Sequence, residues 1–255
     1  AAGMVAQMAK MGPSAFSLMK EFSRMASHFE EFNIVFIPKE YQPKAETFDE
    51  SYLFVGPSIL PRHDAPDFPF EQLKSNLPLL YISLGSVFTN QVDFYKHCFA
   101  AFGEQSWQVV LSIGKNTDLT TLGPVPENFL LAGYVPQLEL LPRAHLFVTH
   151  GGANSVMESI YFGVPTVLIP QQPEQHMNAQ RTVELGMGVL LEKEDVTAQT
   201  LRAAVGRVSN DATYRENAQR MQQAVRAEGG YQAAADGIER FTARKAKPQK
   251  IEVKR

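Results

Sequence analysis

The sequence has little cysteine, little charge and no long apolar run. Of its 255 residues only Cys98 is a cysteine, so an intramolecular disulfide is excluded. The longest apolar runs, at residues 79–84 and 165–170, have the length of a strand, whereas crossing a bilayer takes about 20 residues. These absences exclude a disulfide-stapled domain and predict that the chain does not insert stably into a membrane.

The start of the sequence also lacks the pattern of a secretion signal. Residues 1–11 place no basic segment ahead of their apolar residues. Because a lone cysteine is typical of a reducing compartment, we expect a cytoplasmic protein. No group of Cys and His has the spacing of a zinc site, and no acidic pair is spaced to hold Mg²⁺ against a diphosphate. We therefore expect neither a metal nor another cofactor.

Charge is low in total and unevenly distributed. The formal net charge is −3, from 24 basic and 27 acidic residues, and 44% of the residues are hydrophobic. This many hydrophobic side chains can form a buried core, so we do not expect the chain as a whole to be disordered. Residues 241–255 hold six basic residues and one acidic residue. A basic tail can bind nucleic acid or acidic lipid, but the acidic body argues against a nucleic-acid footprint, so we interpret the tail as a solvated end.

The first part of the chain differs in pattern from the rest. Methionine and phenylalanine recur every three or four residues over 1–31, which predicts helix, and a β-branched and aromatic run at 33–37 predicts one strand. Seven prolines between residues 38 and 78 indicate an extended linker. We expect a small N-terminal part at 1–57, a main domain at 58–240 and the basic tail beyond it.

In the main domain, apolar strands alternate with helices. Strands are expected at residues 79–84, 107–113, 128–134, 145–149, 166–169 and 189–192. Helices are expected at residues 93–102, 154–162, 174–185, 197–209, 212–228 and 232–244. This alternation is typical of an α/β fold with a doubly wound parallel sheet. Such sheets bind ligands at the carboxyl ends of their strands, where the strand order reverses.

One loop combines glycines with polar side chains. The segment His150-Gly151-Gly152-Ala153-Asn154-Ser155 follows a strand and opens a helix, so its backbone N–H groups and the helix dipole favour a bound phosphate, with Asn154 or Ser155 able to cap. The loop lacks the lysine of a P-loop, and no G-x-G-x-x-G occurs, which disfavours a nucleotide hydrolase or a dinucleotide dehydrogenase. His150 can donate to a diphosphate oxygen without a metal.

Glu158 follows Asn154 by four residues and therefore lies on the same helical face, one turn deeper. A carboxylate there repels phosphate but can accept hydrogen bonds from the two hydroxyls of a ribose. It can equally serve as a partner of the helix dipole. The spacing alone leaves both interpretations open.

Four segments in order carry a family resemblance. They are Ile82-Ser83-Leu84-Gly85-Ser86, Tyr134-Val135-Pro136-Gln137, the His150–Ser155 loop with Glu158, and Pro173-Glu174-Gln175 before Asn178. From about residue 33 to about residue 241 the chain resembles the C-terminal half of a GT-B glycosyltransferase of the UDP-dependent family 1 type, such as the bacterial macrolide and flavonoid glycosyltransferases. The resemblance implies a Rossmann-like donor-binding domain plus a remnant of the N-terminal acceptor domain.

The resemblance also assigns roles to individual residues. Ser86 would contact a phosphate, Tyr134 would offer an aromatic face to uracil, Val135 would bind the uracil edge through its backbone, and Gln137 would approach the nucleoside. The diphosphate would be held by His150, Gly152, Asn154 and Ser155. Glu158 would bind the ribose hydroxyls, and Glu174 with Gln175 the hydroxyls of the sugar. Relatives often have Trp at position 134, where Tyr offers a smaller aromatic face. Plant relatives often have Asp at position 174, so the sugar preference stays open.

The implied activity is inverting transfer of a hexose, expected to be glucose, from a UDP-sugar substrate to a hydroxyl of a small-molecule acceptor. In this family the general base is a histidine of the N-terminal domain. The only histidine among the first 32 residues is His28, which we interpret as an exposed helix residue. We therefore expect the base and the acceptor pocket in an N-terminal domain of the same or a separate chain. A donor-binding subunit of a bipartite glycosyltransferase and a GT-B nucleotide-sugar epimerase are the alternatives.

Overall fold

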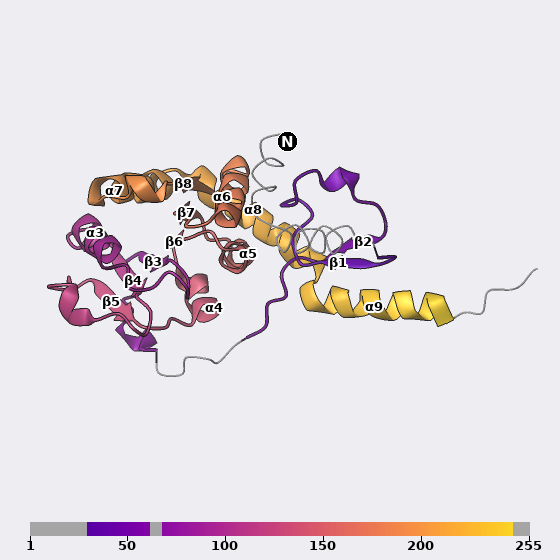
Figure 1. Cartoon of the computed structure of the whole chain (residues 1–255), viewed down its shortest axis with the longest axis horizontal. Coiled ribbons are helices and arrows are strands. Elements are labelled where there is room, and N and C mark those ends of the chain that lie inside the picture. The colour runs from indigo at the N-terminus through magenta and orange to yellow at the C-terminus, as the bar shows by residue number, and fades with distance from the viewer. Residues whose placement is uncertain (1–29, 62–67, 247–255) are drawn as a thin grey trace, which may run out of the picture.

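The computed structural model describes residues 30–61 and 68–246. The helix expected over most of 1–31, His28 and the tail beyond residue 246 lie outside the described residues. Two sheets are present in the described part, a large one of six strands and a small one of two strands (Figure 1). None of the described helices is long and apolar enough to cross a bilayer.

The large sheet is parallel throughout, as predicted. Its strands are β3 (Leu79–Ser83), β4 (Gln108–Ser112), β5 (Phe129–Ala132), β6 (Leu146–Thr149), β7 (Thr166–Leu168) and β8 (Gly188–Leu190). They lie in the order β5-β4-β3-β6-β7-β8. The chain builds outward from β3 to β5 and then returns to place β6 on the other side of β3. The strand order therefore reverses between β3 and β6, which is where a doubly wound sheet binds its ligand.

Helices cover both faces of this sheet (Figure 1). They are α3 (Val92–Phe102), α4 (Gln137–Leu140), α5 (Ala153–Phe162), α6 (Pro173–Glu184), α7 (Ala198–Asn210) and α8 (Ala212–Glu228), and α9 (Gly230–Ala246) follows α8. Short 3₁₀ helices occur at Ala45–Thr47, Phe70–Gln72, Leu119–Thr121, Leu141–Arg143 and Lys193–Asp195. Every helix and strand expected in the described main domain is present, with bounds that differ by at most two residues. The third strand ends two residues early, at Ala132, because Gly133 and Tyr134 turn into the loop.

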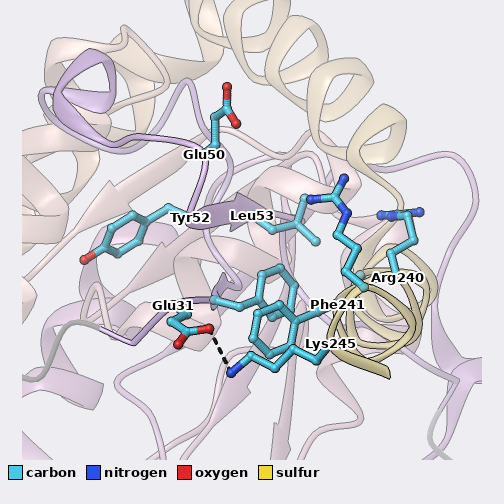
Figure 2. Close-up of a pocket in the computed structure, with 10 residues that line it drawn as sticks. Glu31, Glu50, Tyr52, Leu53, Arg240, Phe241 and Lys245 are labelled. Carbon is cyan, nitrogen blue, oxygen red and sulfur yellow. Dashed lines mark ion pairs between the residues drawn. The ribbon is translucent and has the colours of Figure 1, made fainter. Parts of the chain in front are cut away.

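The small sheet pairs β1 (Asn33–Val35) with β2 (Tyr52–Phe54) in parallel. The sequence predicts β1 but not β2, because β2 has only three residues and lies among prolines. Helix α9 packs beside this sheet, and Phe32 stacks on Phe241 with ring centroids 5.0 Å apart. Lys245 pairs with Glu31 at 2.8 Å, and a groove of about 910 Å³ lies between β2 and the helix (Figure 2).

The boundary expected after residue 240 therefore falls inside α9 rather than at the end of a domain. The change to basic charge at this point suggested a tail. The apolar and small positions Ala234, Gly237 and Phe241 nevertheless continue one helical face toward β1 and β2, and Gly237 leaves no room for a side chain beside Leu53. The continued apolar face, rather than the change to basic charge after residue 240, therefore indicates how far this helix extends.

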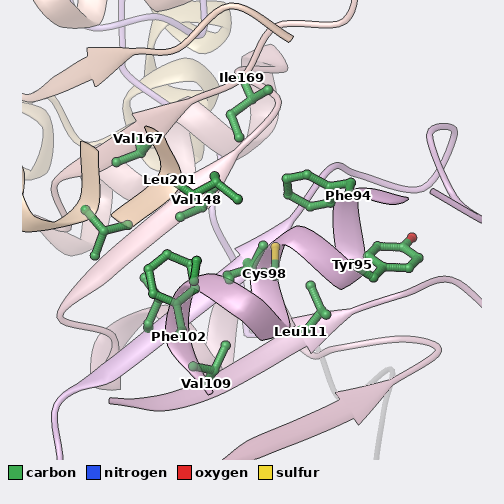
Figure 3. Packing of buried hydrophobic residues seen from close by; sticks show 14 of the residues in the cluster. Phe94, Tyr95, Cys98, Phe102, Val109, Leu111, Val148, Val167, Ile169 and Leu201 are labelled. Atoms are coloured by element: carbon green, nitrogen blue, oxygen red, sulfur yellow. The ribbon is translucent and has the colours of Figure 1, made fainter. Parts of the chain in front are cut away.

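The main core lies between α3, α7 and one face of the large sheet (Figure 3). Side chains alternate along β3, so Leu80 and Ile82 face this core whereas Leu79 and Tyr81 face a second cluster on the opposite side. Cys98 is a fully buried residue of α3, and burial raises the pKa of its thiol, so the sulfur stays protonated.

Gly206 in α7 offers a test of helix stability. A Cβ at this position meets no atom within 4 Å, so Gly206→Ala should raise the free energy of unfolding by about 0.5–1 kcal/mol through helix propensity. Gly188→Ala is the contrasting variant, because its Cβ would clash with the carbonyl oxygen of Thr166 and lower stability. Urea unfolding measures both, and a Gly206→Ala protein less stable than the parent would contradict this account of α7.

Candidate functional site

A cavity of about 730 Å³ opens at the carboxyl ends of the central strands. Its wall comes from the loops after β3, β4, β5 and β6, from the first turns of α5 and from the start of α6. Ten of the eleven predicted site residues line it, namely Ser86, Tyr134, Val135, Gln137, His150, Gly152, Asn154, Ser155, Glu158 and Glu174. Segments more than eighty residues apart in the sequence thus meet at the switch point of the sheet.

The glycine turn after β6 leads directly into α5. Gly152 is the N-cap of this helix, and no side chain caps it. The expectation that Asn154 or Ser155 caps the helix is therefore wrong, because both residues already lie inside its first turn, past the cap position. The first backbone N–H groups consequently have no side-chain acceptor, and the positive end of the dipole faces the cavity. This is the arrangement in which helix N-termini bind anions.

The imidazole of His150 lies between two glycines that leave it no spare room. A Cβ at Gly85 would lie 2.7 Å from Cε1 of the ring, and a Cβ at Gly152 would lie 2.5 Å from Nε2. Nδ1 of the ring lies 3.4 Å from the hydroxyl of Thr149. Burial lowers the pKa of His150, and the charge of Glu174 partly offsets that effect. The ring is therefore neutral at pH 7 and carries a single N–H donor.

Glu158 is held in the cavity wall by a neighbouring amide. Its side chain is only 7% exposed, and its Oε2 accepts a hydrogen bond of 2.7 Å from Nε2 of Gln137. The same Nε2 lies 3.4 Å from the hydroxyl of Ser155. The carboxylate thus lines the cavity one turn deeper than the N-terminus of α5. This position favours a role toward a bound molecule over a role as a helix-dipole partner alone.

An aromatic ring borders the cavity at the end of β5. Tyr134 is 45% exposed, and Nζ of Lys115 lies 5.9 Å from its ring centroid. Val135 beside it is buried. A half-exposed ring over a polar cavity offers a face on which a planar base can stack.

Glu174 and Gln175 do not act as the side-by-side pair that we expected. Glu174 is exposed and lines the cavity, where its Oε1 accepts a hydrogen bond of 2.7 Å from Asn178. Gln175 is buried and outside the cavity wall, and its Oε1 accepts from the backbone N–H of Gln171 at 2.9 Å. Consecutive helical residues point about 100° apart, so only one of these two side chains faces the cavity. Gln175 instead fixes the turn before α6.

The sequence analysis assigned no role to several residues of the cavity wall. They are Tyr81, Ser83, Gly85, Thr89, Ser112, Gly114, Lys115, Asn116, Gly133 and Ala153. Lys115 is the one lysine or arginine among the described residues of this wall, which also includes the two carboxylates of Glu158 and Glu174. The signal that could have found it is its position three residues after β4 ends at Ser112, at the same edge of the sheet as His150.

A parallel sheet with a glycine turn, an uncapped helix N-terminus and an acid one turn deeper places this chain with the C-terminal half of a GT-B glycosyltransferase. The chain belongs to the family of the erythromycin biosynthesis protein CIII-like C-terminal domain, whose sequence model matches residues 96–239. The resemblance to GT-B glycosyltransferases and the α/β fold class are thereby confirmed.

Individual relatives agree with this assignment. The chain is 46% identical over 220 residues to the NDP-glycosyltransferase YjiC of Bacillus subtilis, covering 86% of this chain and 56% of the relative. It is 36% identical over 209 residues to the oleandomycin glycosyltransferase of Streptomyces antibioticus, covering 81% of this chain and 48% of the relative. The crystal structure of the calicheamicin glycosyltransferase CalG4 matches with a TM-score of 0.78 and 33% identity, covering 92% of this chain and 62% of that one. The chain thus spans about half the length of the curated relatives that it matches.

The close fit around His150 can be tested by two glycine variants. Gly85 and Gly123 have similar positive φ angles of 83° and 77°, but a Cβ at Gly123 meets nothing within 4 Å. Gly123→Ala should therefore lose about 1–2 kcal/mol of stability from backbone strain alone. Gly85→Ala should lose about 1–3 kcal/mol more, because the added methyl displaces the imidazole.

Thermal unfolding compares these two variants, and NMR of the imidazole protons reports the position of the ring. Equal losses of stability, with an unchanged His150 spectrum in Gly85→Ala, would show that the ring has room to spare.

Proposed function

We propose that this chain is the donor-binding portion of a UDP-sugar-dependent glycosyltransferase. The whole enzyme would transfer a hexose, expected to be glucose, with inversion to a hydroxyl of a small molecule such as a macrolide or a flavonoid. The observation that carries the proposal is the cavity in which the N-terminus of α5, a neutral His150 and the deeper carboxylate of Glu158 meet. Relatives named for oleandomycin and calicheamicin support the acceptor class.

The diphosphate would lie at the glycine turn. The start of α5 and His150 line one cavity, and Ser86, Asn154 and Ser155 line it too. When the bond from the sugar to the diphosphate breaks, negative charge builds up on the departing UDP. Donors that are already in place around that charge lower the barrier without having to reorganise.

The nucleoside would extend from the diphosphate toward β5. The exposed face of Tyr134 suits stacking with uracil, and the backbone of Val135 lies beside it. Glu158, held by Gln137, would accept hydrogen bonds from the ribose hydroxyls. Glu174, at the rim of the same cavity, would contact hydroxyls of the sugar. The two carboxylates thus face the neutral hydroxyl-bearing parts of the donor, while the helix terminus faces its anionic part.

An inverting transfer also needs a base that takes the proton of the acceptor hydroxyl as it attacks the anomeric carbon. We place this base and the acceptor pocket in an N-terminal domain, which the same chain or a separate one would supply. The chain described here contributes donor binding and stabilisation of the leaving group.

Calorimetry with UDP tests donor binding. The chain should bind UDP, and Glu158→Gln should weaken binding by about ten- to a hundredfold, because hydrogen bonds to a charged acceptor contribute about 1.5–3 kcal/mol. Glu127→Gln is the matched control, since it removes the same charge from an exposed side chain outside the cavity wall. Absence of any heat with UDP, in a chain that unfolds cooperatively, would refute donor binding.

The pH dependence of binding tests the role of His150. Its pKa is lowered in the free protein, and a bound diphosphate would raise it, so the complex would bind more protons than the free chain. Affinity for UDP-glucose, which has no group titrating between pH 6 and 8, should therefore increase as the pH falls through this range.

His150→Asn should remove that slope, whereas His97→Asn, on α3 outside the cavity, should keep it. An affinity that falls with decreasing pH in the unaltered chain would contradict this role.

A further inference from the structure

A buried tyrosine of the cavity wall is linked to the acid of the cavity through one amide side chain. Tyr81 is in the middle of β3, is only 2% exposed, and stacks on Phe147 of β6 with ring centroids 4.6 Å apart and planes within 3°. Its position is thus fixed by the two strands that border the switch point. Burial raises the pKa of Tyr81, so its hydroxyl keeps its proton and can donate.

The hydroxyl of Tyr81 donates to Oε1 of Gln137 at 3.0 Å, and Nε2 of Gln137 in turn donates to Oε2 of Glu158 at 2.7 Å. The hydrogen bonds therefore run from β3 through Gln137 to the carboxylate in α5.

The orientation of the Gln137 amide decides what faces Glu158. An amide has one end that accepts and one that donates, and the two can exchange places by rotation. The donated hydrogen bond from Tyr81 holds the accepting end toward the tyrosine hydroxyl. The donating end therefore meets the carboxylate. In the opposite orientation an amide oxygen would face the carboxylate oxygens, and the two acceptors would repel.

We propose that Tyr81 is a positioning residue that, through Gln137, holds the carboxylate of Glu158 in the place where it recognises the 2′-hydroxyl of a nucleoside ribose. The inference rests on the proposed function and adds to it a source of selectivity for ribose over 2′-deoxyribose. A site built to bond a hydroxyl discriminates against an analogue that lacks it only if its own acceptor is held in place.

Tyr81→Phe removes the hydroxyl and keeps the stacked ring. Calorimetry with UDP and 2′-deoxy-UDP should show the Kd for UDP rising about five- to tenfold and that for the deoxy compound by less than about twofold, as expected for the loss of one positioned hydrogen bond. Tyr95→Phe is the matched control, because its hydroxyl is also buried but donates to the backbone oxygen of Ile113. It should leave the preference for UDP unchanged.

A double variant distinguishes positioning from general support of the fold. In a Glu158→Gln background, Tyr81→Phe should have no further effect on the UDP to deoxy-UDP ratio, because the group that it positions is gone. Independent effects in the two backgrounds, or a Tyr81→Phe protein that keeps the full preference for UDP, would overturn the inference. A parent chain that binds neither nucleotide would instead refute the proposed function.

Should Tyr81→Phe fail to fold, Gln137→Met offers a second test. It removes both hydrogen bonds of the Gln137 amide, from Tyr81 and to Glu158, while keeping the length of the side chain. It should likewise reduce the preference for UDP over deoxy-UDP. A folded Gln137→Met protein that still prefers UDP to deoxy-UDP would contradict the claim that Tyr81 positions Glu158 through Gln137.

Discussion

The cavity depends on how closely two loops approach each other at the switch point. The loop after β3 and the loop after β6 meet around the His150 ring, and the missing side chains of Gly85 and Gly152 make space for it. The ring then fills that space and becomes part of the wall. If either loop carried a Cβ here, the imidazole could not lie where the uncapped helix terminus and the two carboxylates surround one volume.

The buried sheet makes this approach possible. Because β3 and β6 are adjacent, parallel and in register from Leu80 with Leu146 to Ser83 with Thr149, their ends are fixed side by side. The stack of Tyr81 on Phe147 extends the same register into the cluster below the cavity. Packing in the interior therefore sets the geometry of polar groups at the surface, and the two cannot vary independently.

The sequence predicted the parts of this structure that have a local cause. The apolar runs of the strands, the helical periodicity and the glycine turn around His150 are all patterns of neighbouring residues. Ten of the predicted site residues line one cavity. What it missed depends on contacts between distant segments. The role of Tyr81 depends on its hydrogen bond to Gln137, which lies 56 residues away in the sequence. Strand β2 forms only by pairing with β1. The direction of the Gln175 side chain depends on the residue at which α6 begins. A pattern of residue types does not contain such pairings.

The burial of Cys98 has a practical consequence for spectroscopy. The sequence holds no other cysteine, and this thiol is buried in the core on the inner side of α3 and kept protonated. Thiol-directed dyes and spin labels react with accessible thiolates, so the native protein should not be labelled by them. A cysteine introduced at the rim of the cavity would carry a single label, and the distances or fluorescence recorded from it would report on that rim alone.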